Sequence, residues 1–561
     1  MCGIWLQVVA NNGDASIEKP PQWLLNRGPD YSRIDQVTPS IRLGASILHI
    51  QGDFLTRQPF HDSAGNVLAF NGEIFRFDSE RNDIPAESSD TESLSKIFGN
   101  LNKPDDVISH LETLRGPFAF VFYHKASDCI WFGRDFFGRR SLVMRRSSLS
   151  LEIASICIDD ETDWKEVPCT GIFSVSARNA LLPNSVEHYS WSHLTGKQLD
   201  ENTDPPLPCF PQTYHYVDEN VTMLHRLMSA AMARRIHCLG NHHRDDTDSA
   251  RVGLLFSGGL DCSVLAAFAH EHIPIEEPID LLNFAFGTQP MLVPDRQTAI
   301  NSMLELQQRF PERRWRLIEI NVELDELSRH AEYIYDLIKP SVTVMDFNLG
   351  SVLWFSGRGQ GVVLRDTTSR QPIISQHCRY SSVEYRDPTN IESYYDGTEA
   401  WGQYRSRCRL LLSGLGADEL FGGYARHRTA YKRGGWEFAR RELELDQRRL
   451  YRRNMGRDDR LLADSGRDTM YCYLDRDVRE FVRSLPLNEV SRLDLPASEG
   501  GDKLLLRQLA VHLGLPGLAQ LQKRAIQFGT RIANKSISGT EVLCREKLQG
   551  ELNVIVRSKP V

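Results

Sequence analysis

Hydrophobic residues in the first third of the chain occur in short runs that alternate with polar positions or are rich in aromatic and β-branched side chains. The runs are CGIWLQVV, IRLGASILHI, NVLAFNGEIF, FAFVFYH, CIWFGRD and LSLEIASI, beginning at residues 2, 41, 66, 118, 129 and 149. Such runs are typical of strands, whereas TESLSKIFGNL, from Thr91, has the apolar spacing of a helix. Residues 1 to about 185 therefore predict stacked antiparallel sheets with some helix.

The pattern changes in the second half, where buried-type strands alternate with helical runs. VGLLF, LLNFAF, RLIEINV and LLLSG are followed by VLAAFAHEH, TAINSMLELQQRF, ELSRHAEYIYDLI and ELFGGYARHR. This alternation predicts an α/β domain with a largely parallel sheet, whose ligands bind outside the C-terminal ends of the strands. Residues 357–404 interrupt the pattern with polar and Tyr-rich sequence, which predicts an insertion or long loop.

A proline-rich stretch separates the two textures. KQLDENTDPPLPCFPQTYH, residues 197–215, has four prolines and no apolar periodicity, so it predicts an extended linker. The expected organisation is an N-terminal domain at 2–190, a linker at 191–220 and a C-terminal domain at 221–541.

Composition narrows the classes of protein. The chain has 561 residues, of which 41% are hydrophobic and 25% charged, an ordinary globular balance that excludes a disordered chain. A net charge of −8 disfavours a dedicated nucleic-acid binder. We find no run of about 18 apolar residues and no signal-peptide pattern, and the 11 cysteines are scattered without a CxxC pair. These features predict a cytoplasmic protein whose partners are neither nucleic acid nor membrane.

An arginine-rich stretch at 426–460 leaves RNA binding as an alternative. Interspersed acidic residues, with apolar residues at helical spacing, favour a charged face of a helix instead.

The first chemical signal is Cys2. Removal of Met1 would leave a free α-amine beside the thiol. That amine has a pKa of about 8, so it can act as the general base for the thiol. Taken alone, a cysteine at the second position is also explained by the need for a small residue there.

Cys2 lies in the first of five segments that occur in this order: MCGIW, RGPD, FNGEIF, SSDTE and GRDFFGRR. This ordered set resembles the class II glutamine amidotransferases, which have the αββα sandwich of N-terminal nucleophile proteins. The resemblance implies that Cys2 attacks the side-chain amide of glutamine and releases ammonia. It further implies an oxyanion hole from Asn71 and Gly72, and binding of the glutamine α-amine by Asp90 with Glu73 nearby.

One position departs from that family. The family has an arginine that holds the glutamine carboxylate, and here Ile47 stands in its place. Loss of a bidentate clamp should weaken glutamine binding. Arg27 and Arg57 lie nearby in sequence.

The second signal is SGGLDCS, between the strand VGLLF and a helix. Glycines let the backbone approach an anion, and the helix N-terminus donates hydrogen bonds to it. The segment lacks the Walker A pattern and resembles the PP-loop of ATP pyrophosphatases, with a cysteine in place of the last serine of SGGxDS. The resemblance implies ATP binding by Ser257, Gly258, Gly259, Asp261, Cys262 and Ser263.

The third signal is LLLSGLGADELFGGYARHR, which resembles a segment of the asparagine synthetases. The family places a glutamate where this chain has Leu415, and leucine cannot act as a base. The resemblance implies further ligand-binding roles: adenylate contacts from Ser413 and Gly414, a nucleotide pocket lined by Phe256 and Phe286, magnesium binding by Asp261 and Asp418, and charge neutralisation on the pyrophosphate by Lys523.

Together these motifs resemble the asparagine synthetase domain-containing proteins, a divergent branch of the asparagine synthetase family. The resemblance implies a carbon–nitrogen ligase that uses ATP and Mg²⁺ to convert aspartate, glutamine and ATP into asparagine, glutamate, AMP and pyrophosphate. The expected partners are these small molecules, with a homodimer left open. Two alternatives remain: a catalytically degenerate homologue that acts as a scaffold or regulatory partner, and an enzyme with a different acceptor.

Overall fold

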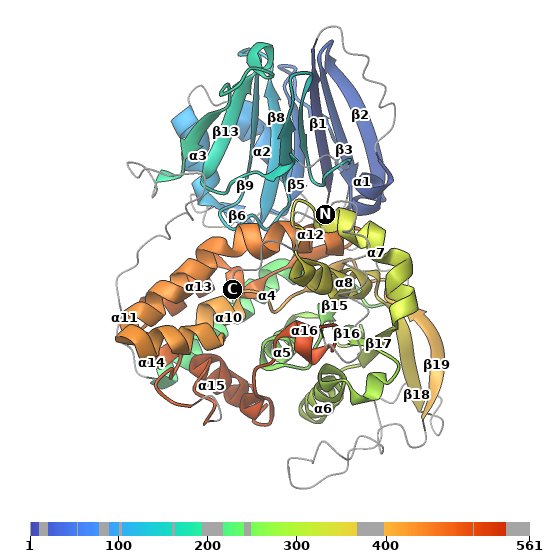
Figure 1. The fold of residues 1–561 in the computed structure, drawn as a ribbon, viewed down its shortest axis with the longest axis vertical. Helices are drawn as coiled ribbons and strands as arrows, with labels where there is room; N and C mark the ends of the chain where they lie inside the picture. The colour runs from blue at the N-terminus through green and yellow to red at the C-terminus, as the bar shows by residue number, and fades with distance from the viewer. Residues whose placement is uncertain are drawn as a thin grey trace.

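The computed structural model describes ten segments of the chain: residues 2–10, 21–52, 54–77, 89–99, 104–159, 163–192, 217–240, 248–366, 398–496 and 499–533. In Figure 1 these residues form two bodies, an upper one from the first part of the chain and a lower one from the rest.

The upper body contains two six-stranded antiparallel sheets. The first sheet has the order β12 (Lys165–Glu166), β10 (Val143–Arg146), β11 (Ser150–Ala154), β1 (Gly3–Val9), β3 (Ile41–Ile47) and β2 (Tyr31–Thr38). The second has the order β14 (Glu187–Ser190), β13 (Gly171–Ser176), β9 (Cys129–Arg134), β8 (Phe118–His124), β5 (Val67–Gly72) and β4 (Phe60–His61). A small separate pair is formed by β6 (Arg76–Phe77) and β7 (Leu114–Arg115).

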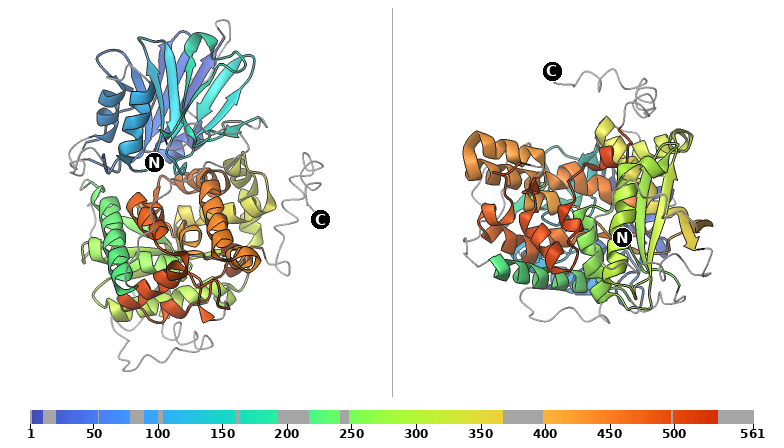
Figure 2. Two further views of the ribbon diagram at one scale, coloured as in Figure 1. Left: turned by 90° about the vertical axis from the view of Figure 1, so that its left-hand side faces the viewer. Right: turned by 90° about the horizontal axis from the view of Figure 1, so that it is seen from below.

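The alternation along the strands explains how the two sheets stack. Ile4, Leu6 and Val8 of β1 lie in a core cluster that both sheets share, whereas Trp5 packs with Leu24 of α1 (Gln22–Arg27) on the opposite face. Helices α2 (Asp90–Gly99) and α3 (Pro104–Thr113) pack against the outer face of the second sheet, as Figure 2 shows. Among the described residues, the predicted αββα layering is thus complete on one side, and only the six-residue α1 covers the other.

The lower body is built on a seven-stranded sheet of mixed direction. Its order is β19 (Thr398–Arg405), β18 (Gln360–Asp366), β17 (Trp315–Val322), β16 (Ile279–Phe286), β15 (Val252–Leu255), β20 (Leu410–Leu412) and β21 (Asp468–Met470). The five neighbouring strands β17, β16, β15, β20 and β21 are parallel to one another, as predicted. β18 pairs antiparallel with β17, and β19 pairs antiparallel with β18. The long loop predicted at 357–404 is therefore wrong at both described ends: β18 pairs with β17 and β19, and β19 forms the edge of the sheet. Residues 367–397 lie outside the described part.

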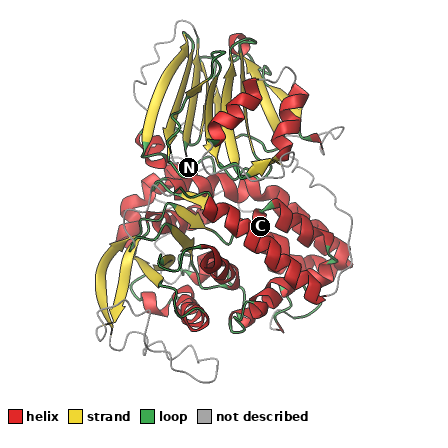
Figure 3. Ribbon diagram, turned by 180° about the vertical axis from the view of Figure 1, so that it is seen from behind, coloured by secondary structure: helices red, strands yellow, loops and turns green. Residues whose placement is uncertain are grey.

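Hydrophobic cores lie on both faces of this sheet, which explains its continuous apolar runs. Leu281 and Leu410 point into one cluster, and their neighbours Leu282 and Leu411 point into the other. Helices α5 (Leu260–His272), α6 (Pro294–Arg309) and α7 (Leu324–Ile338) follow β15, β16 and β17, and α8 (Val344–Arg358) follows α7. Helices are drawn red in Figure 3.

The other helices complete the lower body: α4 (Val217–His237), α10 (Ala417–Phe421), α11 (Ala425–Leu450), α12 (Gly456–Ala463), α13 (Arg476–Ser484), α14 (Leu487–Val490), α15 (Leu504–His512) and α16 (Ile526–Gly529). Helix α4 begins inside the predicted linker, so residues 217–220 are helical; the last proline of that stretch is at 211. The arginine-rich stretch forms α11, where Arg441 pairs with Glu437 and Arg448 with Glu444, as expected for a charged helix face. No helix in the described segments is long and apolar enough to span a bilayer.

Buried ion pairs join the two bodies. Arg27 of α1 contacts Asp459 of α12 at 2.6 Å, and Arg140 contacts Asp468 of β21 at 2.7 Å. All four side chains are at most 1% exposed. Charges buried this deeply depend on their partners, so the two bodies meet in a defined geometry.

Candidate functional site

The N-terminal cysteine lies where the upper body faces the lower one. Cys2 is 9% exposed and directly precedes β1. Its backbone N–H donates to Oδ1 of Asn71, on β5, at 3.0 Å. The Nδ2 group of Asn71 is buried without a hydrogen-bond partner among the described residues. A donor left free beside a thiol is what an oxyanion site requires.

The backbone after Asn71 is tightly packed. Gly72 ends β5, and a Cβ atom there would come within 2.3 Å of the Pro117 carbonyl oxygen. The strand can therefore end beside the cysteine only with glycine at this position.

The charges of two carboxyl groups, those of Glu73 and Asp90, act on the Cys2 thiol and raise its pKa. Burial, and then the charge of Asp90, raises the pKa of Glu73 well above its usual value. Burial also raises the pKa of Asp90, the first residue of α2, to about 6. The Oε2 atom of Glu73 has no hydrogen-bond partner in the described residues. Burial raises the pKa of the Cys2 thiol to about 11, so the thiol needs a base to become a nucleophile.

The arginines near this site have other contacts. The Nη2 group of Arg27 pairs with Asp459, and its Nε group lies 3.4 Å from the Cys2 carbonyl oxygen. The exposed Arg57 lies over the ring of Tyr31, 5.6 Å from its centroid. Ile47 is 4% exposed at the end of β3. Arg27 thus joins the cysteine segment to the lower body.

In the lower body, the glycine turn between β15 and α5 has a constrained backbone. Gly258 has a φ of +76°, and a Cβ atom there would lie 2.4 Å from the Ala299 backbone. The N–H of Gly259 donates to Oγ of Ser257 at 3.3 Å. Only glycine fits at 258, and the turn exposes its backbone at the C-terminal end of a parallel strand.

The remaining predicted residues of this turn are buried. The Cys262 thiol lies 3.7 Å from Oγ of Ser257, and burial raises its pKa to about 11. The Ser263 hydroxyl donates to the Gly258 carbonyl oxygen at 3.3 Å. Phe256 and Phe286 are buried in different apolar clusters, on opposite sides of the sheet.

A second turn follows β20 and meets the first. A Cβ atom on Gly414 would lie 3.1 Å from Cβ of Asp261, so the two turns touch. Oγ of Ser413 accepts a hydrogen bond from the N–H of Leu415 at 3.3 Å. Sequence reasoning placed both turns at one sheet edge, and the structure brings them together.

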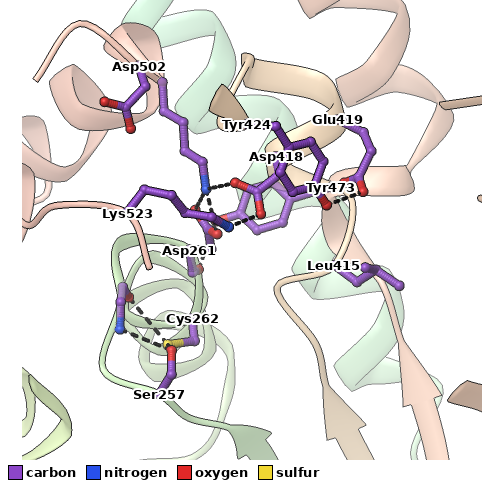
Figure 4. Close-up of polar contacts among 12 residues, drawn as sticks. Ser257, Asp261, Cys262, Leu415, Asp418, Glu419, Tyr424, Tyr473, Asp502 and Lys523 are labelled. Atoms are coloured by element: carbon purple, nitrogen blue, oxygen red, sulfur yellow. Dashed lines mark hydrogen bonds and ion pairs between the residues drawn. The ribbon is translucent and has the colours of Figure 1, made fainter. Parts of the chain in front are cut away.

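Two lysines and two aspartates form the centre of this site (Figure 4). The Nζ group of Lys503 lies 2.7 Å from Asp261 and 2.6 Å from Asp418, and Lys523 also pairs with Asp418. Burial alone would raise the pKa of Asp418, but Lys503 and Lys523 hold it well below its usual range. Burial opposes the charge on Lys503, yet the two carboxylates raise its pKa above the usual value.

Lys503 is a functional candidate that the sequence motifs did not identify. It is 3% exposed, precedes α15 and has a φ of +55°, an uncommon conformation for a side chain of this kind. In the sequence, Lys503 is followed by the apolar run LLL. This pattern predicts only the start of a helix and gives no sign of a functional lysine.

The surroundings of Leu415 are apolar. Leu415 packs against a cluster that includes Phe137, Leu450 and Leu474. The nearby Glu419 accepts a hydrogen bond from the Tyr424 hydroxyl at 2.6 Å, and burial raises its pKa to about 7. Leucine suits this cluster, whereas a glutamate at 415 would require desolvation of its charge.

The donor set fits a magnesium-bound polyphosphate. One ammonium group bridges Asp261 and Asp418, so one cation can contact both carboxylates, and oxygen donors are those that Mg²⁺ prefers. Within the described segments there is no group of three or more His, Cys, Asp or Glu side chains placed to hold a metal ion. The substrate's phosphate oxygens would complete the coordination.

Comparison with known families agrees with this division of the chain. The family model of the glutamine amidotransferase domain matches residues 1–158, and that of asparagine synthase matches residues 388–438. The fold and the two sites therefore define a protein of the glutamine amidotransferase and asparagine synthase class.

Full-length relatives define the family more closely. Asparagine synthetase domain-containing protein 1 of Bos taurus is 31% identical over 95% of this chain and 96% of its own length. The Homo sapiens protein of that name is 30% identical over 95% of each chain. A putative glutamine-hydrolysing asparagine synthetase of Methanocaldococcus jannaschii is 25% identical over 75% of this chain and 64% of its own length. The chain belongs to the asparagine synthetase domain-containing proteins, as its motifs predicted.

Proposed function

We propose that this chain is a glutamine-dependent, ATP-dependent ligase that forms an amide, with aspartate as the carboxylate substrate. Its products would be asparagine, glutamate, AMP and pyrophosphate. Membership of the family and the two sites support this proposal. The domain limits and the roles of individual residues are part of it.

In the glutamine half-reaction, the Cys2 sulfur attacks the amide carbon of the glutamine side chain. The thiol proton passes to the α-amine of Cys2 after Met1 is removed, and from there to the departing ammonia. The free Nδ2 group of Asn71, with the Gly72 N–H, would stabilise the oxyanion of the tetrahedral intermediate. Water then hydrolyses the thioester and releases glutamate.

In the synthetase half-reaction, a carboxylate oxygen of aspartate attacks the α-phosphorus of ATP, and pyrophosphate leaves. Ammonia then attacks the acyl carbon, AMP leaves, and the nitrogen loses a proton to give the amide. Asp261 and Asp418 would hold Mg²⁺, which supplies positive charge to the leaving pyrophosphate. Lys503 and Lys523 are placed to neutralise the same group.

The observation that carries the proposal is the ion-pair cluster of Lys503. The cluster joins Asp261 after β15 to Asp418 after β20, at the sheet edge where ligands of parallel α/β folds bind. Two partly buried carboxylates joined by a buried lysine form a prepared site for a metal and a polyanion.

Two positions favour a second candidate, a catalytically degenerate homologue acting as a scaffold or regulatory partner. Ile47 is buried where the family carries an arginine, and Leu415 packs in an apolar cluster where the family carries a glutamate. The free donor of Asn71 and the intact aspartate–lysine cluster favour the enzyme instead.

ATP–pyrophosphate exchange with a panel of carboxylates tests the proposal. Exchange that depends on aspartate and is lost in Asp418→Asn supports the ligase. Exchange that depends on another carboxylate would reassign the acceptor. No exchange with any carboxylate, in a protein that still binds Mg–ATP, would support the degenerate homologue.

A further inference from the structure

A cavity of about 240 Å³ lies between the two bodies, and none of the residues assigned above to catalysis or ligand binding lines it. Its upper wall includes Phe136, Phe137 and Trp191, and its lower wall comes from α4 and the start of α13. Phe75 and Phe137 come from the segments FNGEIF and GRDFFGRR, but the reaction proposed above does not use the cavity as a site.

The walls of this cavity carry an excess of positive charge. Seven arginines line it against four acidic residues, Glu112, Asp135, Asp475 and Asp477. Each acidic side chain already has a donor. Asp475 pairs with Arg234 and Arg235 at 2.9 Å each, Asp135 pairs with Arg139 at 2.9 Å, and Asp477 pairs with Arg76 at 3.1 Å. Glu112 accepts from the Ser192 hydroxyl at 2.7 Å. The acidic side chains of the lining are thus already engaged, and Arg476 pairs with Glu480 outside the lining, so the walls offer an anion a positively charged surface without competing free carboxylates.

Arg479, on α13, is the arginine that lacks an anionic partner. It is 4% exposed, its Nε and Nη1 groups have no hydrogen-bond partner, and it forms no ion pair within the described segments. The nearby Glu480 pairs with Arg476 at 2.5 Å. A buried guanidinium without a counter-charge is costly and normally signals a partner.

Aromatic rings surround this guanidinium. Its central carbon lies 5.2 Å from the ring centroid of Phe137 and 5.8 Å from that of Phe136. Burial, together with Arg483 and Arg476, lowers the pKa of Arg479 to about 9. Phe75 and Phe118 add further apolar surface to the cavity. A cavity of about 150 Å³ already holds a benzene molecule, so a one-ring ligand with an anionic group fits in this larger one.

We propose that this cavity binds a small organic anion, a carboxylate or phosphate attached to a flat apolar group, and that Arg479 pairs with the anionic end. Such a ligand would contact both bodies at once, since its ring lies against the upper wall and its charge against α13. The inference does not rest on the proposed ligase reaction.

Binding of simple probes to the full-length chain tests this proposal. 4-Fluorobenzoate is followed by ¹⁹F NMR, with phenyl phosphate and benzoate as competitors. Benzamide has the shape of benzoate without its charge, and inorganic phosphate has the charge without the ring. We expect saturable 4-fluorobenzoate binding that benzoate and phenyl phosphate displace, and at least tenfold weaker effects of benzamide and inorganic phosphate.

Two variants locate the site. Arg479→Met removes the unpaired charge and should weaken 4-fluorobenzoate binding about ten- to a hundredfold. Arg483→Gln is the matched control, because Arg483 lies one turn further along α13, pairs with Glu444 at 3.4 Å and does not line the cavity. It should change binding less than about twofold.

Three outcomes would overturn the proposal: no saturable binding of 4-fluorobenzoate up to about 10 mM, equal binding of benzoate and benzamide, or unchanged binding in Arg479→Met. If Arg479→Met does not fold, Arg479→Gln removes the charge but keeps a polar side chain, and it should weaken 4-fluorobenzoate binding to a similar extent. Unchanged binding in Arg479→Gln would contradict the role of Arg479.

Discussion

The carboxyl groups of the upper and lower sites lie in opposite electrostatic settings. Glu73 and Asp90 are buried beside each other, and their pKa values are raised. Asp261 and Asp418 are also close together, but Lys503 bridges them and the pKa of Asp418 is lowered. Burial raises the pKa of Asp90, and it would raise that of Asp418 too, so the two lysines beside Asp418 reverse the direction of its shift.

This difference indicates what each site is prepared to accept. The upper pair has a surplus of acidic groups and gains most from an incoming cation, such as the α-ammonium group of an amino acid. The lower pair already holds its own cations and gains from a polyanion that shares them, such as a magnesium-bound polyphosphate. Under the proposed function, one chain would thus separate an acidic site that suits an amine from a charge-balanced lysine–aspartate site that suits a polyphosphate.

The sharpest test of this separation removes the upper nucleophile alone. Cys2→Ala should lower glutamine hydrolysis by about 10⁴-fold or more, because no other group can form the thioester. Ammonia-dependent amide formation and pyrophosphate exchange should stay within about twofold of the parent, since both use only the lower site. Cys157→Ala, at another buried cysteine, is the matched control and should retain glutamine hydrolysis.

The identity of the first residue tests whether the α-amine of Cys2 is the base in glutamine hydrolysis. Fully active protein should begin at Cys2 by intact-mass analysis. Retention of Met1 in active protein would contradict the role of the α-amine.

The next test removes the bridging lysine. Lys503→Met leaves the partly buried Asp261 and Asp418 facing each other without the buried ammonium group that bridges them, so we expect a loss of about 3 kcal/mol in the free energy of unfolding by urea. Lys339→Met removes a partly exposed pair with Asp336, 3.0 Å apart, and should cost less than about 1 kcal/mol. Equal costs for the two variants would show that the cluster does not stabilise the fold.

The pH dependence of stability distinguishes the two pairs further. The pKa of Asp90 is about 6 in the fold and about 4 when unfolded, so its protonated form is favoured by folding. Its contribution is fully present below pH 4 and is lost as pH rises through 6, amounting to about 3 kcal/mol. Asp90→Asn should remove this decline in the urea midpoint between pH 4 and 7. Parallel profiles for parent and variant would contradict the assignment.

Asp418 should behave in the opposite sense. Its pKa lies below the usual value, so its contribution is present above about pH 4 and is lost as pH falls further. Asp418→Asn should therefore differ most from the parent above pH 4, and the difference should shrink in acid.

The sequence predicted the architecture better than the details of the sites. Strand periodicity and glycine turns identified β1, β8 and the parallel order of the lower sheet, because these depend on local pattern. Lys503 was missed because its role depends on the meeting of two turns with a helix start about 85 residues further along the chain. β18 and β19 were missed because the stretch 357–404 was assigned as a whole from its polar, Tyr-rich composition, although β18 contains the apolar run VVL.

The arginine missing from the upper site separates the enzyme from the degenerate homologue, with a smaller expected effect. If Ile47 stands where a carboxylate clamp belongs, Ile47→Arg should lower the KM for glutamine about tenfold, the lower end of a hydrogen bond to a charged group. Turnover with ammonia should not change, because ammonia bypasses glutamine binding. Ile47→Leu is the control for repacking of a buried side chain and should leave KM unchanged.

Arg27 is held by Asp459, so the alternative clamp to consider is Arg57, which is exposed beside Tyr31. If Ile47→Arg binds glutamine no better while Arg57→Gln raises the KM for glutamine, then Arg57 is the residue that holds the glutamine carboxylate. If neither variant nor the parent hydrolyses glutamine, the upper site has lost its reaction while the lower one keeps its lysine–aspartate cluster.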